Sequence, residues 1–209
     1  MKTRDEPEIE LLCAAVMKND GGTAMVLFIN ACVRRQSRTL RLAKCLLEKL
    51  GSEAEELRLD QVAFPVADEA FLEKRDHLIA AGDFNDPLFA MARQFAAADI
   101  IVIAAPYWDL SFPAALKQYI EQINVLGITF AYTAEGIPQG LCKARKLCYV
   151  TTAGGSFVPE EFGFGYVRTL AQNFYGIPEV ELIQAAGLDI DGADDEGILR
   201  DAIERIRSL

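Results

Sequence analysis

The sequence predicts an α/β protein whose core is a five-stranded, doubly wound parallel sheet with helices on both faces. Short apolar segments of strand length alternate with longer segments whose apolar residues recur with helical periodicity. The strand-like segments are nearly free of charge, as expected of strands that are covered on both faces. With 209 residues, the chain has the size of one ordinary domain and can bury a sizeable core.

Five segments have the composition of strands. The clearest is 99–105 (DIIVIAA), an almost continuous apolar run, and the weakest is 55–59. The expected strands, in chain order, are 25–31, 55–59, 99–105, 146–152 and 180–186.

Helical segments lie between these strands. Proline at the first turn favours helix starts at 87 and 113, and Gly51 is a candidate C-cap for the helix before it. The expected helices are 37–50, 87–98, 113–126, about 159–175 and 194–209. The apolar stripe of the first is expected to be Leu40, Ala43, Leu47 and Leu50, and that of the last Ile198, Ala202, Ile206 and Leu209.

The order of these elements restricts the topology. Right-handed crossovers between parallel strands make the flavodoxin-like strand order 2-1-3-4-5 the simplest arrangement of five strands. Residues 60–85 then form an excursion over the surface rather than a second domain. Ligands of such sheets bind beyond the carboxyl ends of the strands, so the residues after Ala31, Ala105 and Thr152 are the first candidates for a site.

Composition excludes several functional classes. The formal charge of −10, from 21 basic and 31 acidic residues, argues against general nucleic-acid binding. No apolar run approaches the roughly 20 residues of a membrane-spanning helix. The five cysteines contain no CxxC pair, which favours a reducing, cytoplasmic location and no metal site. The single histidine, His77, leaves little room for a zinc centre or a Ser-His-Asp triad.

The first 24 residues have no clear place in this fold. They lack the basic start and the long apolar stretch of a signal peptide. They form either a short appended extension or the product of a misassigned start, since Met25 stands directly before the first strand. Residues 25–209 are expected to form the domain itself.

The loop after the first strand is strongly basic. Residues 30–44 hold five of the 21 basic residues and no acidic residue. At the start of a helix, free N–H groups, the helix dipole and the hydroxyls of Ser37 and Thr39 can converge on a phosphate. The alternative interpretation is a solvated basic helix face on which Ser37 is a plain N-cap.

The same loop also matches a phosphatase pattern. Cys32 to Thr39 reads C-x5-R-[ST], as in the phosphate loop of low-molecular-weight cysteine phosphatases. In this alternative Cys32 would be a thiolate nucleophile and Arg38 would bind the phosphate. The mechanism also needs a general acid, and the one Asp-Pro pair, Asp86-Pro87, stands before the second helix rather than late in the chain.

The loop after the third strand is rich in aromatic residues. Pro106 is followed by Tyr107 and Trp108, and a helix opens at Pro113. Adjacent aromatic side chains at the mouth of a sheet can form a slot for a flat ring system. The alternative is that they close the top of the core.

A long stretch of the chain resembles the FMN-dependent NAD(P)H:quinone oxidoreductase and azoreductase family, which has a flavodoxin-like fold. The matching motifs are the aromatic loop, LKQYIE at 116–121, GITFAY at 127–132, Gly140-Leu141 and Gly154-Gly155. They occur in the family's order and spacing, and the resemblance extends from Met25 to the C-terminus.

The resemblance implies an FMN enzyme that takes electrons from NAD(P)H and reduces quinones, azo dyes or nitro compounds by ping-pong two-electron transfer. The flavin carries the chemistry, so no catalytic acid or base is expected. In this family the hairpin of Phe130 and Tyr132 lies near the active site, which the second subunit of a homodimer completes, so the resemblance also implies a homodimer. The residues expected to contact FMN are Asn30, Ser37, Arg38, Thr39, Pro106, Tyr107, Trp108, Asp109, Leu110, Thr152, Gly154, Gly155 and Phe157. Phe162 is expected beside Phe130 and Tyr132 in the substrate pocket.

Two departures from the family pattern bear on the chemistry. Asp109 stands where an amide residue is common, and Phe157 replaces the usual histidine. A carboxylate at position 109 is expected to disfavour the reduced, anionic flavin and to lower its reduction potential.

One alternative belongs to a different functional class. It is a flavodoxin-type electron carrier without NAD(P)H turnover, which the acidic charge favours because such carriers dock on basic partners. The hairpin motif favours the enzyme.

Overall fold

The computed structural model describes residues 24–208 and contains the predicted sheet. Five parallel strands have the order β2-β1-β3-β6-β7, which is the expected order 2-1-3-4-5. The strands are β1 (Val26–Asn30), β2 (Ala54–Arg58), β3 (Ile100–Ala104), β6 (Lys146–Thr152) and β7 (Glu179–Ala185). Each lies within a residue or two of its expected range.

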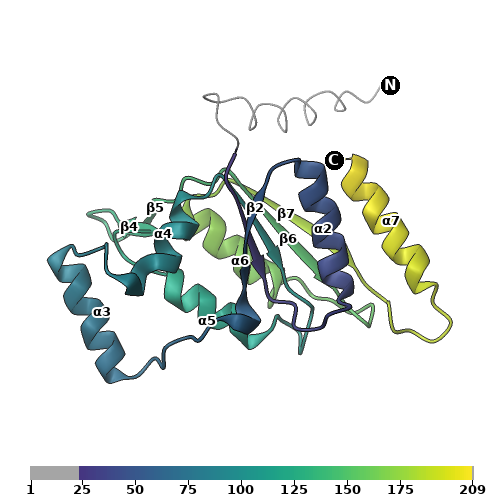
Figure 1. The fold of residues 1–209 in the computed structure, drawn as a ribbon, viewed down its shortest axis with the longest axis horizontal. Coiled ribbons are helices and arrows are strands. Elements are labelled where there is room, and N and C mark those ends of the chain that lie inside the picture. Colours follow the sequence, from purple (N-terminus) through teal and green to yellow (C-terminus); the bar gives the residue numbers. More distant parts are fainter. Residues whose placement is uncertain (1–23, 209) are drawn as a thin grey trace.

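Helices cover both faces of this sheet (Figure 1). On one face lie α2 (Arg38–Leu50) and α7 (Asp195–Ser208), and on the other lie α4 (Ala90–Ala97), α5 (Ala114–Ile123) and α6 (Phe164–Leu170). Successive residues of β1 alternate between them: Val26 and Phe28 pack toward α2, whereas Leu27 and Ile29 pack toward α4 and α5. Because both faces of β1 are buried, its first four residues are apolar, and only the last, Asn30, is polar.

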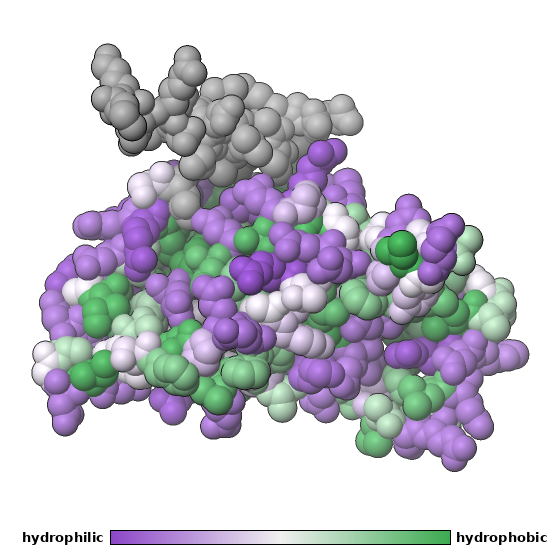
Figure 2. All heavy atoms as spheres, turned by 180° about the vertical axis from the view of Figure 1, so that it is seen from behind, coloured by the Kyte–Doolittle hydropathy of each residue, from purple (hydrophilic) through white to green (hydrophobic). Residues whose placement is uncertain are grey.

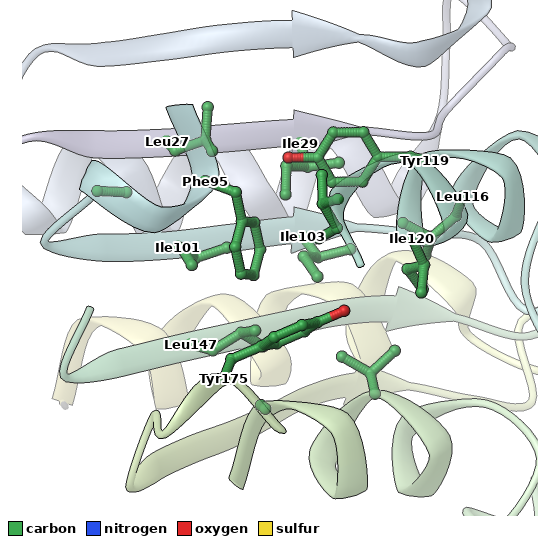
Figure 3. Close-up of a cluster of buried hydrophobic side chains, with 14 of the residues drawn as sticks. Leu27, Ile29, Phe95, Ile101, Ile103, Leu116, Tyr119, Ile120, Leu147 and Tyr175 are labelled. Atoms are coloured by element: carbon green, nitrogen blue, oxygen red, sulfur yellow. The ribbon is translucent and has the colours of Figure 1, made fainter. Parts of the chain in front are cut away.

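Aromatic side chains pack among aliphatic ones in the larger of the two cores, under α4, α5 and α6 (Figure 3). The Phe95 ring centroid lies 4.9 Å from that of Tyr175 and 6.4 Å from that of Tyr119, both in edge-to-face geometry. All three side chains are buried. This core anchors α5, whose first residue follows the aromatic loop directly.

The predicted helix start at Ser37 is confirmed, but the apolar stripe of α2 is partly different. Ser37 caps the helix by accepting the Leu40 N–H at 3.2 Å, and Gly51 ends it with a left-handed φ of 64°. The most deeply buried leucines are Leu42 and Leu46, while Leu40 and Leu47 lie at the edge of the stripe.

The last helix shows a similar shift of its buried face. In α7 the buried residues are Leu199, Ala202 and Ile206, and Ile198 is only partly buried. Leu209 lies outside the described residues.

Three further elements differ from the sequence expectation. The excursion 60–85 contains an unpredicted helix, α3 (Glu69–Ala81), which has no buried residue and which carries the exposed His77. The helix α5 ends at Ile123 rather than 126, because the Thr129 hydroxyl donates to the Ile123 carbonyl at 2.6 Å. The helix expected from 159 starts only at Phe164, and it continues as a π-helical turn, η3 (Ala171–Tyr175).

Short elements complete the chain. The 3-10 turns η1 (Leu59–Gln61) and η2 (Pro87–Phe89) precede α3 and α4. A separate antiparallel hairpin of β4 (Phe130–Tyr132) and β5 (Pro138–Gly140) packs against η3. Gly140 makes that contact possible, since a Cβ there would lie 2.1 Å from the backbone nitrogen of Gly176.

Seen from behind, hydrophilic residues separate several small hydrophobic patches on the surface (Figure 2). No helix among residues 24–208 is long and apolar enough to cross a membrane. The expectation of an N-terminal extension concerns residues 1–24, and all of these but Ala24 lie outside the described residues.

Candidate functional site

Four loops meet at the carboxyl edge of the sheet, where the strand order reverses between β1 and β3. Backbone hydrogen bonds continue past the strands into these loops: Ala31 N–H donates to Ala104 at 2.9 Å, Tyr107 to Thr152 at 3.0 Å and Ala153 to Ala185 at 2.9 Å. The loops after β1, β3 and β6 are those selected from the sequence. The loop after β7 is a fourth wall that sequence reasoning missed.

The start of α2 has the properties of an anion site. The Leu40 N–H is capped by Ser37, but Arg38 and Thr39 stand too early in the helix for their N–H groups to find helical acceptors. The first turn of α2 contains no acidic residue. The Thr39 hydroxyl is buried and lies 2.6 Å from that of Thr152, which ties this turn to β6. We call residues 37–39 the anion turn.

Asn30 shapes the loop before this turn. Its side-chain oxygen accepts the Cys32 N–H at 2.9 Å, and its amide nitrogen donates to Glu56 at 2.7 Å. Both polar groups of this buried side chain therefore have partners inside the protein. Asn30 lies at the edge of the site and fixes the direction in which the chain leaves β1.

The Arg38 side chain turns away from the anion turn toward the loop after β7. Its guanidinium donates to a carboxylate oxygen of Asp189 at 2.6 Å and to the Leu188 carbonyl at 3.1 Å, and it lies 3.8 Å from Asp195. Because Asp189 follows the last strand at the same edge of the sheet, the rule that selected the other loops would also have selected it.

Cys32 does not have the environment of a nucleophile. It is buried, and its Sγ lies 3.7 Å from the Ala104 carbonyl oxygen. Burial raises the pKa of this thiol to about 11, despite an opposing hydrogen bond from Ser37. With the thiol protonated at neutral pH and Arg38 held by Asp189, the cysteine phosphatase alternative loses both of its catalytic groups.

The aromatic loop forms a tight two-residue turn. Trp108 and Ser111 exchange two backbone hydrogen bonds, of 2.8 and 3.1 Å, across Asp109 and Leu110. These two residues have φ values of 50° and 66°, a conformation that costs free energy in residues other than glycine and that often marks functional sites. We call residues 106–111 the ring loop.

The two aromatic residues of the ring loop have different roles. Trp108 and Leu110 are exposed at 39% and 46%, so they are available to a ligand. The Tyr107 hydroxyl is buried without a hydrogen-bond partner among the described residues, and burial raises its pKa. The Tyr107 hydroxyl thus points into the protein, while the Trp108 side chain is accessible from outside.

The two glycines of the turn after β6 do different things. A Cβ on Gly154 would lie 2.3 Å from a carboxylate oxygen of Asp189, whereas one on Gly155 would meet nothing within 4 Å. Neither glycine has a left-handed φ. Gly154 thus lies against the Asp189 side chain of the loop after β7, and Gly155 borders open space.

Exposed phenylalanines follow this turn. Phe157 is 77% exposed and Phe162 is 58% exposed. The Ser111 hydroxyl donates to the Phe162 carbonyl at 2.8 Å, which ties the ring loop to the segment after β6. The site thus combines an anion turn with exposed apolar side chains, an arrangement that fits a flat, amphipathic molecule carrying a phosphate, such as FMN.

The hairpin residues lie elsewhere. Phe130 stacks edge-to-face with Tyr132 at 5.5 Å and with Phe174 at 5.3 Å. The ring loop precedes α5 and the hairpin follows it, so the two stand at opposite ends of this helix (Figure 1). Within one chain, Phe130 and Tyr132 are therefore not brought to the ring loop.

Comparisons with known proteins agree with this architecture. A family described as having a flavodoxin-like fold matches residues 24–209. An FMN-dependent NADH:quinone oxidoreductase of Clostridium perfringens is 38% identical over 195 residues, covering 88% of this chain and 96% of the relative. A second, from Clostridium acetobutylicum, is 37% identical and covers 87% and 96%.

Solved structures give the same fold. An azoreductase from Bacillus anthracis superposes with a TM-score of 0.77 at 24% identity, covering 88% of this chain and 97% of that one. The sheet order, the match over almost the whole described chain and the identity to full-length relatives lead to one conclusion. The chain belongs to the flavodoxin-like fold family, among the relatives of the FMN-dependent NADH:quinone oxidoreductases.

Proposed function

We propose that this protein is an FMN-dependent NADH:quinone oxidoreductase that also reduces azo and nitro compounds. The observation that carries the proposal is the anion turn lying beside an exposed aromatic turn at the switch point of the sheet. Full-length relatives with that activity share 37–38% of their residues with this chain.

The residues of the site divide between the two ends of the cofactor. The N–H groups of Arg38 and Thr39 and the hydroxyl of Ser37 would hold the phosphate, and Thr152 keeps Thr39 in place. Trp108, Leu110 and Phe157 supply the apolar surface beside the ring, with Asp109, Gly155 and the backbone from Pro106 around them.

Bound FMN supplies the redox chemistry, taking two electrons from NADH and passing them to the acceptor. The chain's own contribution is to bind, orient and exclude water, and no side chain acts as an acid or base. NADH and the acceptor would stack in turn over the same opening, beside the exposed rings of Phe157 and Phe162, which gives ping-pong kinetics.

We further propose a cytoplasmic homodimer. The exposed hairpin residues Tyr132 (52%) and Ile137 (60%) would close the ring-loop opening of a second subunit, because they cannot reach that of their own. Among the described residues, Cys32, Cys45 and Cys142 form no disulfide, as suits a reducing compartment.

Steady-state kinetics tests the proposal. Initial rates with NADH and menadione as varied substrates are expected to give parallel double-reciprocal lines, and size-exclusion chromatography with light scattering to give twice the chain mass. FMN retained without NADH turnover would instead favour the electron carrier. Protein stripped of FMN is the matched control for background turnover.

A further inference from the structure

We propose that Arg38 and Asp189 are a pair of positioning residues, which lock the Gly154–Gly155 turn against the anion turn, and that the Arg38 side chain does not itself hold the phosphate. The inference rests on the proposed binding of FMN and deepens it. It replaces the role that the family resemblance suggests for this side chain.

The geometry commits Arg38 to the loop after β7. One terminal nitrogen of its guanidinium donates to Asp189 at 2.6 Å, and the other donates to the Leu188 carbonyl at 3.1 Å while lying 3.8 Å from Asp195. The side chain is only 32% exposed. Each terminal nitrogen of the guanidinium therefore directs an N–H at an acceptor in the loop after β7.

Asp189 in turn holds the glycine turn. Its N–H donates to the Gly154 carbonyl at 2.9 Å, and its carboxylate lies against Gly154, 2.3 Å from where a Cβ would stand. The N–H of Gly187 donates to the Gly155 carbonyl at 2.9 Å, which adds a second tie to the same turn. The position of Gly155, the open wall of the site, thus depends on the loop that Arg38 clamps.

The two possible roles of Arg38 make opposite predictions for a change at Asp189. If Arg38 bound the phosphate directly, removing its carboxylate partner would free the guanidinium and strengthen FMN binding. If Arg38 acts through Asp189, removing either partner releases the glycine turn and weakens flavin binding. Riboflavin separates the roles further, because it lacks the phosphate but shares the ring.

A second arginine–carboxylate pair nearby provides a matched control. Arg41 lies one turn further along α2, and its guanidinium lies 2.9 Å from Glu196 of α7. The side chains are 46% and 54% exposed. Changing this pair also removes one positive charge from α2 and one negative charge, here from α7, and neither residue contacts the glycine turn.

The test is a binding titration of FMN-free protein with FMN and with riboflavin, in which the quenching of flavin fluorescence reports binding. We expect Arg38→Ala and Asp189→Ala each to raise both dissociation constants by about fivefold, the effect of losing one exposed ion pair. The double variant should lose no more than either single one. We also expect a changed visible spectrum of bound FMN, because the wall beside the ring moves.

The second ion pair serves as the control for this titration. Arg41→Ala and Glu196→Ala should leave both dissociation constants and the spectrum unchanged, and circular dichroism checks that each variant is folded. A loss confined to FMN in Arg38→Ala, or tighter FMN binding in Asp189→Ala, would overturn the inference. If the wild-type protein binds no FMN, it is the proposed function that fails.

Discussion

At the scale of single residues, Asp109 is the charged residue of the ring loop. Asp109 occupies a left-handed conformation with a φ of 50°, next to Leu110 in the same conformation. Its carboxylate is exposed at the opening where the flavin ring is proposed to lie. A fixed negative charge there opposes the additional negative charge of the reduced flavin.

We therefore expect Asp109→Asn to raise the two-electron reduction potential of bound FMN. An increase of about 30 mV corresponds to a tenfold change in the equilibrium of a two-electron couple. Because asparagine tolerates a positive φ as well as aspartate does, the turn should survive the change. Equilibration with reference dyes measures the potential, and an unchanged or lower value would contradict this account of Asp109.

A second prediction at this scale concerns Cys32. Its pKa of about 11 means that the thiolate is scarce at neutral pH and grows only as the pH rises toward that value. Iodoacetamide should therefore label Cys32 of the folded protein at pH 7 about 100-fold more slowly than an ordinary thiol. Mass spectrometry of the labelled peptides measures this rate, with the unfolded protein as control. Rapid labelling in the folded state would restore the phosphatase alternative.

At the scale of elements, the hairpin depends on a close approach of two backbones. Gly140 of β5 packs against Gly176 at the end of η3, and a methyl group on Gly140 would lie 2.1 Å from a backbone nitrogen. The backbones must separate to accept it, which displaces the hairpin that is proposed to complete the partner's site.

Gly140→Ala is thus expected to lower the Tm by about 5 °C, since overpacking costs a few kcal/mol in a chain of this size. It should also weaken the dimer. Scanning calorimetry and light scattering measure the two effects, and Gln139→Ala, an exposed neighbour on the same strand, is the control. A normal Tm and a normal dimer would show that the hairpin contact is not needed.

The sequence predicts some elements far better than others, for identifiable physical reasons. The strands β1, β3 and β6 are buried on both faces, so their apolar runs stand out from the rest of the chain. The helix α3 buries no residue, and a helix without a buried face leaves no apolar periodicity to detect. The early end of α5 depends on the Thr129 hydroxyl, which reaches back from a later turn.

At the scale of the whole molecule, the sequence predicts where the candidate site lies in the fold, but not which of its side chains contact one another. The rule that ligands bind at the carboxyl edge led directly to the ring loop and the anion turn. Arg38 and Asp189 lie 151 positions apart in the sequence, so no local sequence pattern predicts that they pair. The separation of Phe130 from the ring loop likewise follows from the direction of α5 in space.

The fold also makes a prediction about the chain's first residues. The Met25 N–H donates to a carboxylate oxygen of Asp99 at 2.9 Å. Burial alone would raise the pKa of this carboxyl, but its bonds to Lys143 and to Met25 lower it, so the carboxylate is charged at neutral pH. In a protein that starts at Met25, the charged α-amino group would meet that carboxylate.

We propose that residues 25–209 suffice for folding and cofactor binding. The shortened protein should keep its FMN dissociation constant within about twofold and its Tm within about 2 °C, because the partly buried Met25–Asp99 hydrogen bond is kept and the added charge contributes little. Its stability should fall only once the pH drops below 3.8, the ordinary pKa of an aspartate, because the pKa of Asp99 is lowered further in the folded protein. Calorimetry and flavin titration measure both properties, and aggregation of the shortened protein would contradict the domain boundary.

The central claim is that the anion turn and the ring loop together hold FMN and present it to NADH. The most direct measurement is the visible absorption spectrum of protein that has been incubated with FMN, desalted and made anaerobic. We expect retained flavin bands that NADH bleaches and that a quinone then restores. Bands that NADH leaves unchanged would reduce the protein to an electron carrier, and the absence of bands would contradict the account altogether.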